Sequence, residues 1–293
     1  MPNNVRLNPR DFYDALPRSD HRPGDIWRGL PSFGILKNSN VRGLVITPAC
    51  DLSNNKSETI TFLPLCTVNE YLGSRAFAYE CWLEIQPLFS RLSGYDRLQE
   101  PRRYDLLSVS SLEFAKNCTH DSVGKKLTEA ELGRLSAYLK YLIAAANGSA
   151  NASNLKDFFK TDKFKGILKK LVENSLKPDI HFLPSDDLPI EYSAVGSHSI
   201  VLFRYPLSLP IEHLNEVRTM SSEEEWWAHV QKRKGVEKVL SSFGEWPIKL
   251  ACLRKEFYGD LLSRYVNMFV RLGSPDFDDA SVANFASEIE SGK

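Results

Sequence analysis

The sequence predicts an α+β fold: a small antiparallel sheet or barrel built from strands near both ends of the chain. Three observations lead to this prediction. Short apolar and β-branched runs occur near both ends, a block of helical periodicity lies between them, and an amphipathic helix follows towards the C-terminus. Because strands do not alternate regularly with helices along the chain, the fold is expected to be α+β rather than α/β.

The strands are predicted from short apolar runs bounded by turn residues. The strongest run is residues 41–47, in which Leu44, Val45 and Ile46 follow one another. Residues 59–65 are its expected antiparallel partner, across a polar loop at residues 51–58. Further strands are expected at residues 24–28, 102–109, 180–183, 199–205 and 248–253.

The helices are predicted from apolar residues spaced three and four positions apart. Thr128 and Glu131 have the spacing of a capping box and start the first strongly periodic helix, which ends near Asn147. Further helices are expected within residues 154–176, 223–240 and 255–272, and an ambiguous stretch with helical spacing covers residues 68–92.

These elements divide the chain into three parts of one domain. Residues 1–109 form a β-rich part, and residues 110–178 form a helical insertion. Residues 179–293 supply the strands and helices that complete the same domain. A chain of 293 residues is long enough for such a core.

Composition favours a soluble globular protein, with 42% hydrophobic and 25% charged residues. The 37 basic and 37 acidic residues cancel, so no overall field attracts nucleic acid and RNA binding would need a local basic patch. No apolar run approaches the roughly 20 residues that span a bilayer, and no secretory signal is visible. We therefore expect a cytoplasmic protein without a membrane partner.

Metal and cofactor motifs are absent from the sequence. The five cysteines are scattered without a CxxC pair, which predicts reduced thiols rather than a zinc site. The six histidines form no HxxxH or HExxH pattern, and no nucleotide-phosphate loop is present. The sequence therefore predicts no metal and no cofactor.

Candidate chemistry concentrates in residues 41–66, where a strand opens into a loop. Cys50 and Asp51 stand together there, after Thr47, and Lys56 lies in the same loop. A nearby cation would activate the thiol, whereas a neighbouring carboxylate opposes activation. Two interpretations stay open: a catalytic Cys50 and Asp51 with Thr47 and Lys56 as ligand-binding residues, or a buried thiol beside a loop-capping carboxylate.

His181 is the most informative histidine, because it lies inside the strand predicted at residues 180–183. It is either a hydrogen-bonded structural residue or a ligand-binding residue. If it approached Cys50 to within about 4 Å, a Cys–His pair would be credible.

A further pattern joins the GDI of residues 24–26, Arg42 ahead of the apolar residues 44–46, and the FLPL of residues 62–65 followed by Thr67. With this pattern, the N-terminal part resembles the MazF/PemK family of toxin endoribonucleases. The resemblance implies a small SH3-like barrel, in which Arg42 contacts the scissile phosphate and Thr67 assists.

Three other segments, VITPACDL, IHFLP and RLGSP, are similar to segments of uncharacterised bacterial proteins. We associate those proteins with mobile-element and phage-defence gene neighbourhoods. This second resemblance implies a role in antiviral defence or a toxin–antitoxin system.

Three functions are therefore expected, in order of preference. The first is a component of a bacterial phage-defence or toxin-like system that acts through a barrel-based binding surface and a protein partner encoded nearby. The second is a MazF-like endoribonuclease that uses Arg42 and Thr67, with RNA as the nucleic acid bound. The third is a thiol enzyme that uses Cys50. The binding role comes first because the sequence contains no complete catalytic constellation.

Overall fold

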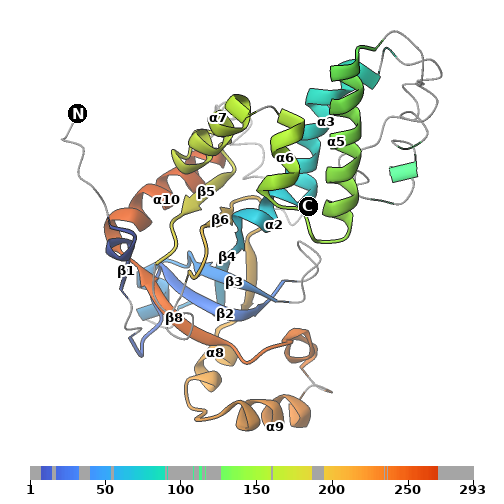
Figure 1. Ribbon diagram of the computed structural model, residues 1–293. Helices are drawn as coiled ribbons and strands as arrows, with labels where there is room; N and C mark the ends of the chain where they lie inside the picture. Colours follow the sequence, from blue (N-terminus) through green and yellow to red (C-terminus); the bar gives the residue numbers. More distant parts are fainter. Residues whose placement is uncertain are drawn as a thin grey trace, which may run out of the picture.

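The fold is α+β, as predicted, and the described residues form an eight-stranded antiparallel sheet (Figure 1). The computed structural model describes residues 8–14, 18–32, 40–53, 56–89, 91, 108, 112–113, 116, 127–159, 161–186, 195–233, 235 and 237–269. No helix in this part of the chain is long and apolar enough to cross a membrane.

The strands follow one another across the sheet in the order β1-β8-β2-β3-β4-β6-β5, and β7 pairs with the first half of β4. Their bounds are β1 Tyr13–Asp14, β2 Asp25–Pro31, β3 Asn40–Val45, β4 Thr59–Thr67, β5 Ile180–Leu183, β6 Ser199–Leu202, β7 Leu207–Pro210 and β8 Ile248–Leu253.

The helices lie on both sides of this sheet and near its ends. Their bounds are η1 Pro9–Phe12, α1 Ala49–Ser53, α2 Val68–Leu72, α3 Arg75–Phe89, α5 Glu129–Ala146, α6 Ala152–Phe159, α7 Thr161–Val172, α8 Ile211–Val217, α9 Glu223–Arg233, η4 Lys238–Ser242 and α10 Lys255–Phe269.

The sheet combines strands from both ends of the chain, as the sequence predicted. The late strand β8 lies between β1 and β2, where Ala251 pairs with Ile26 and Leu253 pairs with Tyr13. The sheet is nevertheless open, because β1 and β5 stand at its opposite ends and do not pair within the described residues. The expected SH3-like barrel is therefore not confirmed.

The predicted hairpin of residues 41–66 is the centre of the sheet. Strands β3 and β4 are antiparallel, with Arg42 opposite Leu65 and Val45 opposite Phe62. The connection between them was expected to be a plain loop, but it contains the short helix α1. That helix buries Leu52, which is 7% exposed, and this contact explains the helical turn.

Among the residues that the structure describes, three hydrophobic clusters form the core and divide between the two faces of the sheet. Alternate residues of β4 point to opposite faces of the sheet. On one face, Leu63 and Leu65 belong to the cluster that also contains Leu261 of α10. On the opposite face, Phe62 and Cys66 belong to the two other clusters. On that other face, one cluster includes α2, α3, α5 and α6, and a separate cluster includes α8, α9 and η4. Figure 1 shows these two helical groups well apart.

Several other predictions can be compared directly with the structure. The capping box of Thr128 and Glu131 starts α5, as predicted. The helix expected at residues 223–240 is interrupted, because α9 ends at Arg233 and η4 follows. Strand β7 and helix α8 were not predicted. Apart from Ser108, the strand expected at residues 102–109 lies outside the described residues.

Candidate functional site

A cleft of about 220 Å³ opens where the start of β3 and the end of β4 lie side by side. Its apolar wall includes Val41, Leu65 and Cys66, which belong to three different hydrophobic clusters. The cleft therefore lies where the three cores meet. Its polar lining includes Arg28, Arg42, Thr67, Glu70, Ser199 and Glu245.

A β-bulge directs Arg28 into this cleft. Between residues 27 and 30, β2 has one residue more than the segment of β3 with which it pairs, and the extra residue lies opposite Arg42. Gly29 allows the bulge with a φ of +76°, and a Cβ there would lie 2.9 Å from the carbonyl oxygen of Trp246. Bulges often re-aim side chains next to functional sites.

Arg42 is the central residue of the cleft. Its Nε is buried and has no hydrogen-bond partner among the described residues. Burial lowers the pKa of Arg42, and the positive charge of Arg28 acts in the same direction, whereas Glu70 and Glu245 oppose both. A guanidinium stays protonated in proteins, so two cations repel each other in the cleft, and the carboxylates of Glu70 and Glu245 line the same cleft.

Thr67 and Glu70 are fixed on the wall of the cleft by the start of α2. The backbone N–H of Thr67 donates to Oε2 of Glu70 at 2.6 Å, and the backbone N–H of Glu70 donates to Oγ1 of Thr67 at 3.1 Å. This reciprocal capping box leaves the Thr67 hydroxyl proton available to a ligand. Glu245 enters from the segment between η4 and β8, and its side chain is exposed.

The structure thus brings together Arg42 and Thr67, two of the four residues predicted to be catalytic. The other two, Cys50 and Asp51, lie apart in α1. Cys50 is exposed, and its Sγ donates to Oδ1 of Asp51 at 3.4 Å. Cys50 and Asp51 therefore contact each other and do not line the cleft.

The residues predicted to bind a ligand beside Cys50 have other contacts. Oγ1 of Thr47 accepts a hydrogen bond from the backbone N–H of Thr61 at 2.7 Å, which ties the end of β3 to β4. Lys56 is exposed, and its backbone N–H donates to the carbonyl of Asp51 at 2.9 Å. Neither residue lines the cleft.

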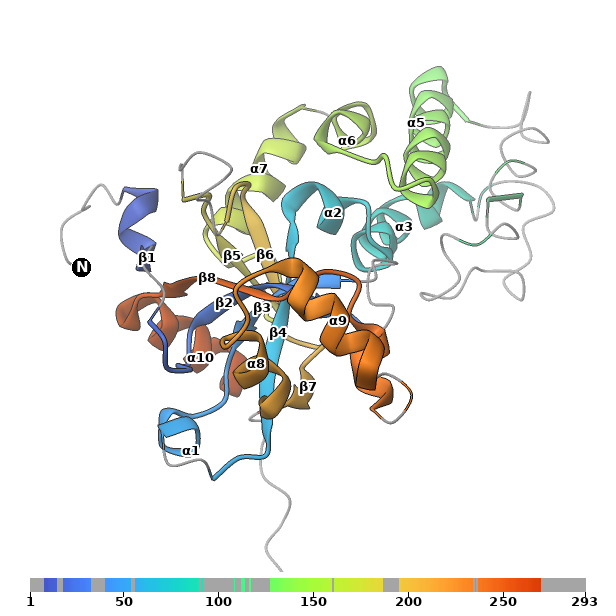
Figure 2. The same ribbon diagram turned by 90° about the horizontal axis from the view of Figure 1, so that it is seen from below.

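His181 is buried in β5 and stacks on Phe203 with 6.2 Å between ring centroids. Burial lowers its pKa to about 4, so it is neutral at physiological pH. Strands β4 and β6 separate β5 from β3, which places His181 about 14 Å from β3 at about 4.8 Å per strand. Figure 2 likewise shows α1, which carries Cys50, far from β5, so the Cys–His pair does not form.

Sequence reasoning missed four polar residues of the lining, namely Arg28, Glu70, Ser199 and Glu245. Only Glu70 had a local signal, because Thr67 and Glu70 have the spacing of a capping box. Arg28 reaches the cleft through a bulge, and Glu245 reaches it through long-range packing.

Comparisons with family models, curated proteins and solved structures give no match to this chain. The resemblances to MazF/PemK proteins and to defence-associated proteins therefore stay predictions.

Proposed function

We propose that the cleft binds a phosphodiester of single-stranded RNA and that the protein is an endoribonuclease. The observation that carries this proposal is the buried Nε of Arg42, which has no hydrogen-bond partner among the residues that the structure describes and shares the cleft with a second cation, Arg28. An anion between the two side chains would supply the missing hydrogen-bond acceptor and relieve their repulsion. A guanidinium fits the paired oxygens of a phosphate better than any other side chain.

The size of the cleft limits the ligand. Pockets for drug-sized molecules and cofactors have volumes of roughly 300–1,000 Å³. At about 220 Å³, this cleft suits a phosphate group and part of its sugar rather than a whole cofactor. An extended polymer that presents one phosphodiester at a time meets this limit.

The side chains present also support cleavage. Arg42 and Arg28 would bind the non-bridging oxygens of the phosphate, and the Thr67 hydroxyl would donate to one of them. Glu245 would accept the proton of the ribose 2′-hydroxyl, whose oxygen attacks phosphorus. The bond to the 5′-oxygen breaks, that oxygen takes a proton from water, and a 2′,3′-cyclic phosphate forms.

The test is an incubation of the purified full-length chain with end-labelled single-stranded RNA and with DNA of the same sequence. We expect cleavage of the RNA alone, because DNA lacks the 2′-hydroxyl. The Arg42→Met variant should lose cleavage. Arg264→Met is the matched control, because Arg264 is an exposed arginine on α10 outside the cleft. Equal cleavage by the Arg42→Met variant and the wild type would refute the proposal.

The first expectation from the sequence, a defence or toxin-like component with a protein partner, stays a prediction. An endoribonuclease would suit the toxic part of such a system. The thiol-enzyme alternative gains no support, since the Cys50 thiol donates a hydrogen bond to Asp51 and does not line the cleft.

A further inference from the structure

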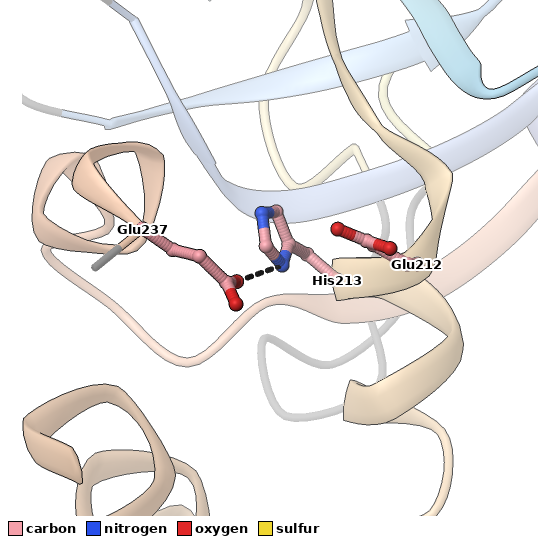
Figure 3. Close-up of side chains that lie close together, drawn as sticks. All are labelled: Glu212, His213 and Glu237. Atoms are coloured by element: carbon pink, nitrogen blue, oxygen red, sulfur yellow. Dashed lines mark ion pairs between the residues drawn. The ribbon is translucent and has the colours of Figure 1, made fainter. Parts of the chain in front are cut away.

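A second group of chemically active side chains lies away from the cleft, between α8 and η4. Glu212 and His213 belong to α8, and Glu237 directly precedes η4. One ligand atom from each of the three residues lies within 4.8 Å of the others. Figure 3 shows His213 between the two carboxylates.

Two buried atoms in this group have no hydrogen-bond partner among the described residues. They are Nδ1 of His213, a residue that is only 1% exposed, and Oε2 of Glu237. Nδ1 of His213 lies 3.7 Å from Oε2 of Glu237 and 3.6 Å from Oε2 of Glu216, and both distances are too long for a hydrogen bond. Because buried polar atoms are nearly always paired, two orphans that face each other indicate a shared partner between them.

The surrounding charges indicate the sign of that partner. Arg233 donates to the Oε1 atoms of Glu216 and Glu237, which leaves Oε2 of Glu237 facing His213. The group contains three carboxylates, from Glu212, Glu216 and Glu237, and one guanidinium, from Arg233. Its formal charge is therefore minus two when the histidines are neutral. A divalent cation would balance this charge.

We propose that His213, Glu237 and Glu212 bind a divalent transition-metal ion of the zinc type. Zinc binds imidazole nitrogen and carboxylate oxygen at roughly 2.0–2.2 Å, which places tetrahedral donors about 3.4 Å apart. The 3.7 Å separation of His213 and Glu237 is close to this value. Glu212 is exposed and closes the site by rotating its side chain, and water completes the coordination. The imidazole ligand disfavours Mg²⁺ and Ca²⁺, which prefer oxygen.

The metal would have a structural role. It would join α8 to the start of η4, two elements whose residues Leu214 and Leu240 share one hydrophobic cluster on the sheet. An ion that binds the folded chain and not the unfolded one stabilises the fold, and above its dissociation constant the stabilisation grows with the logarithm of the ion concentration. This inference does not depend on the proposed ribonuclease activity.

The test uses the full-length protein after treatment with EDTA and dialysis, and it titrates Zn²⁺ alone by calorimetry. We expect one binding site and a melting temperature that rises with Zn²⁺ concentration, with no rise in Mg²⁺. Glu212→Gln should weaken Zn²⁺ binding by at least about tenfold, since the loss of even an outer-shell partner costs this much. The matched control is Glu256→Gln, another exposed glutamate in the first turn of a helix, which should bind Zn²⁺ like the wild type.

Three results would overturn the inference. The first is the absence of Zn²⁺ binding to the wild-type protein. The second is unchanged binding by the Glu212→Gln and Glu237→Gln variants; if the Glu237 variant does not fold, Glu212→Gln decides. The third is an NMR spectrum of the metal-free protein at pH 7 that shows both His213 ring nitrogens protonated, together with no stabilisation by Zn²⁺. That result would make His213 an imidazolium held between carboxylates.

Discussion

Replacement of Arg42 by methionine should abolish RNA cleavage and make the protein more stable. A residue that holds the fold together would show the opposite change in stability. The two signs differ because the buried Nε of Arg42 has no hydrogen-bond partner in the part of the chain that the structure describes. The folded state therefore bears the desolvation cost of this group without a compensating hydrogen bond.

The magnitude follows from that single orphaned donor. A buried donor without a partner costs about 1–3 kcal/mol, and Arg42 is half-buried, so the lower end applies. Methionine keeps the packing of the aliphatic stem. We therefore expect Arg42→Met to raise the free energy of unfolding by about 1 kcal/mol, which corresponds to about 2 °C in melting temperature for a chain of this size.

The assay is chemical denaturation of the wild type and of two methionine variants under identical conditions. Lys249→Met provides the contrast, because Nζ of Lys249 lies 2.8 Å from Oδ2 of Asp25, and these side chains are 8% and 2% exposed. Loss of that lysine leaves a buried carboxylate without its cation and should cost about 3–5 kcal/mol. Destabilisation by Arg42→Met of the same size as that by Lys249→Met would refute the reasoning.

Three further predictions concern catalysis, acid stability and backbone strain. Glu245→Gln should lower kcat for RNA cleavage by about 10²- to 10⁴-fold, the usual contribution of a general base, and an unchanged kcat would exclude Glu245 from that role. His181→Gln should reduce the loss of stability on acidification. Between pH 6.5 and about pH 4, His181 binds a proton in the unfolded chain but not in the folded protein, so the wild type loses stability as the pH falls. Unfolding curves measured across this pH range give the slope for the wild type and the variant. A variant with the wild-type slope would contradict it. Gly29→Ala should lower the melting temperature, because a φ of +76° is strained for alanine and its Cβ would lie 2.9 Å from the Trp246 carbonyl oxygen. An unchanged melting temperature would mean that the bulge relaxes without cost.

Local patterns were sufficient to predict the elements whose signals are short-range. The hairpin of β3 and β4 follows from two apolar runs across a polar loop, and the start of α5 follows from the capping box at Thr128. The placement of β8 within the sheet also agrees with the prediction of strands from both ends.

Long-range pairing could not be predicted in the same way. Whether a sheet closes depends on which strands stand at its edges, and the order β1-β8-β2 results from packing between distant segments. Strand β7 has only four residues with weak alternation, so its pairing with the first half of β4 gives it stability that its sequence does not reveal.

The candidate sites show the same limit. Arg42 and Thr67 were predicted as a pair and line one cleft, because both belong to adjacent strands. Arg28 joins them through a bulge that no sequence rule located. His213 and Glu237 lie far apart in sequence without a metal-binding spacing, and only the packing of η4 against α8 brings them together.

The most direct test of the central claim is the chemical identity of the new RNA ends, measured by mass spectrometry after incubation with the full-length chain. The cleft chemistry predicts a 2′,3′-cyclic phosphate on one fragment and a 5′-hydroxyl on the other, with neither formed by the Arg42→Met variant. Intact RNA, or fragments that carry a 5′-phosphate and a 3′-hydroxyl, would contradict the claim.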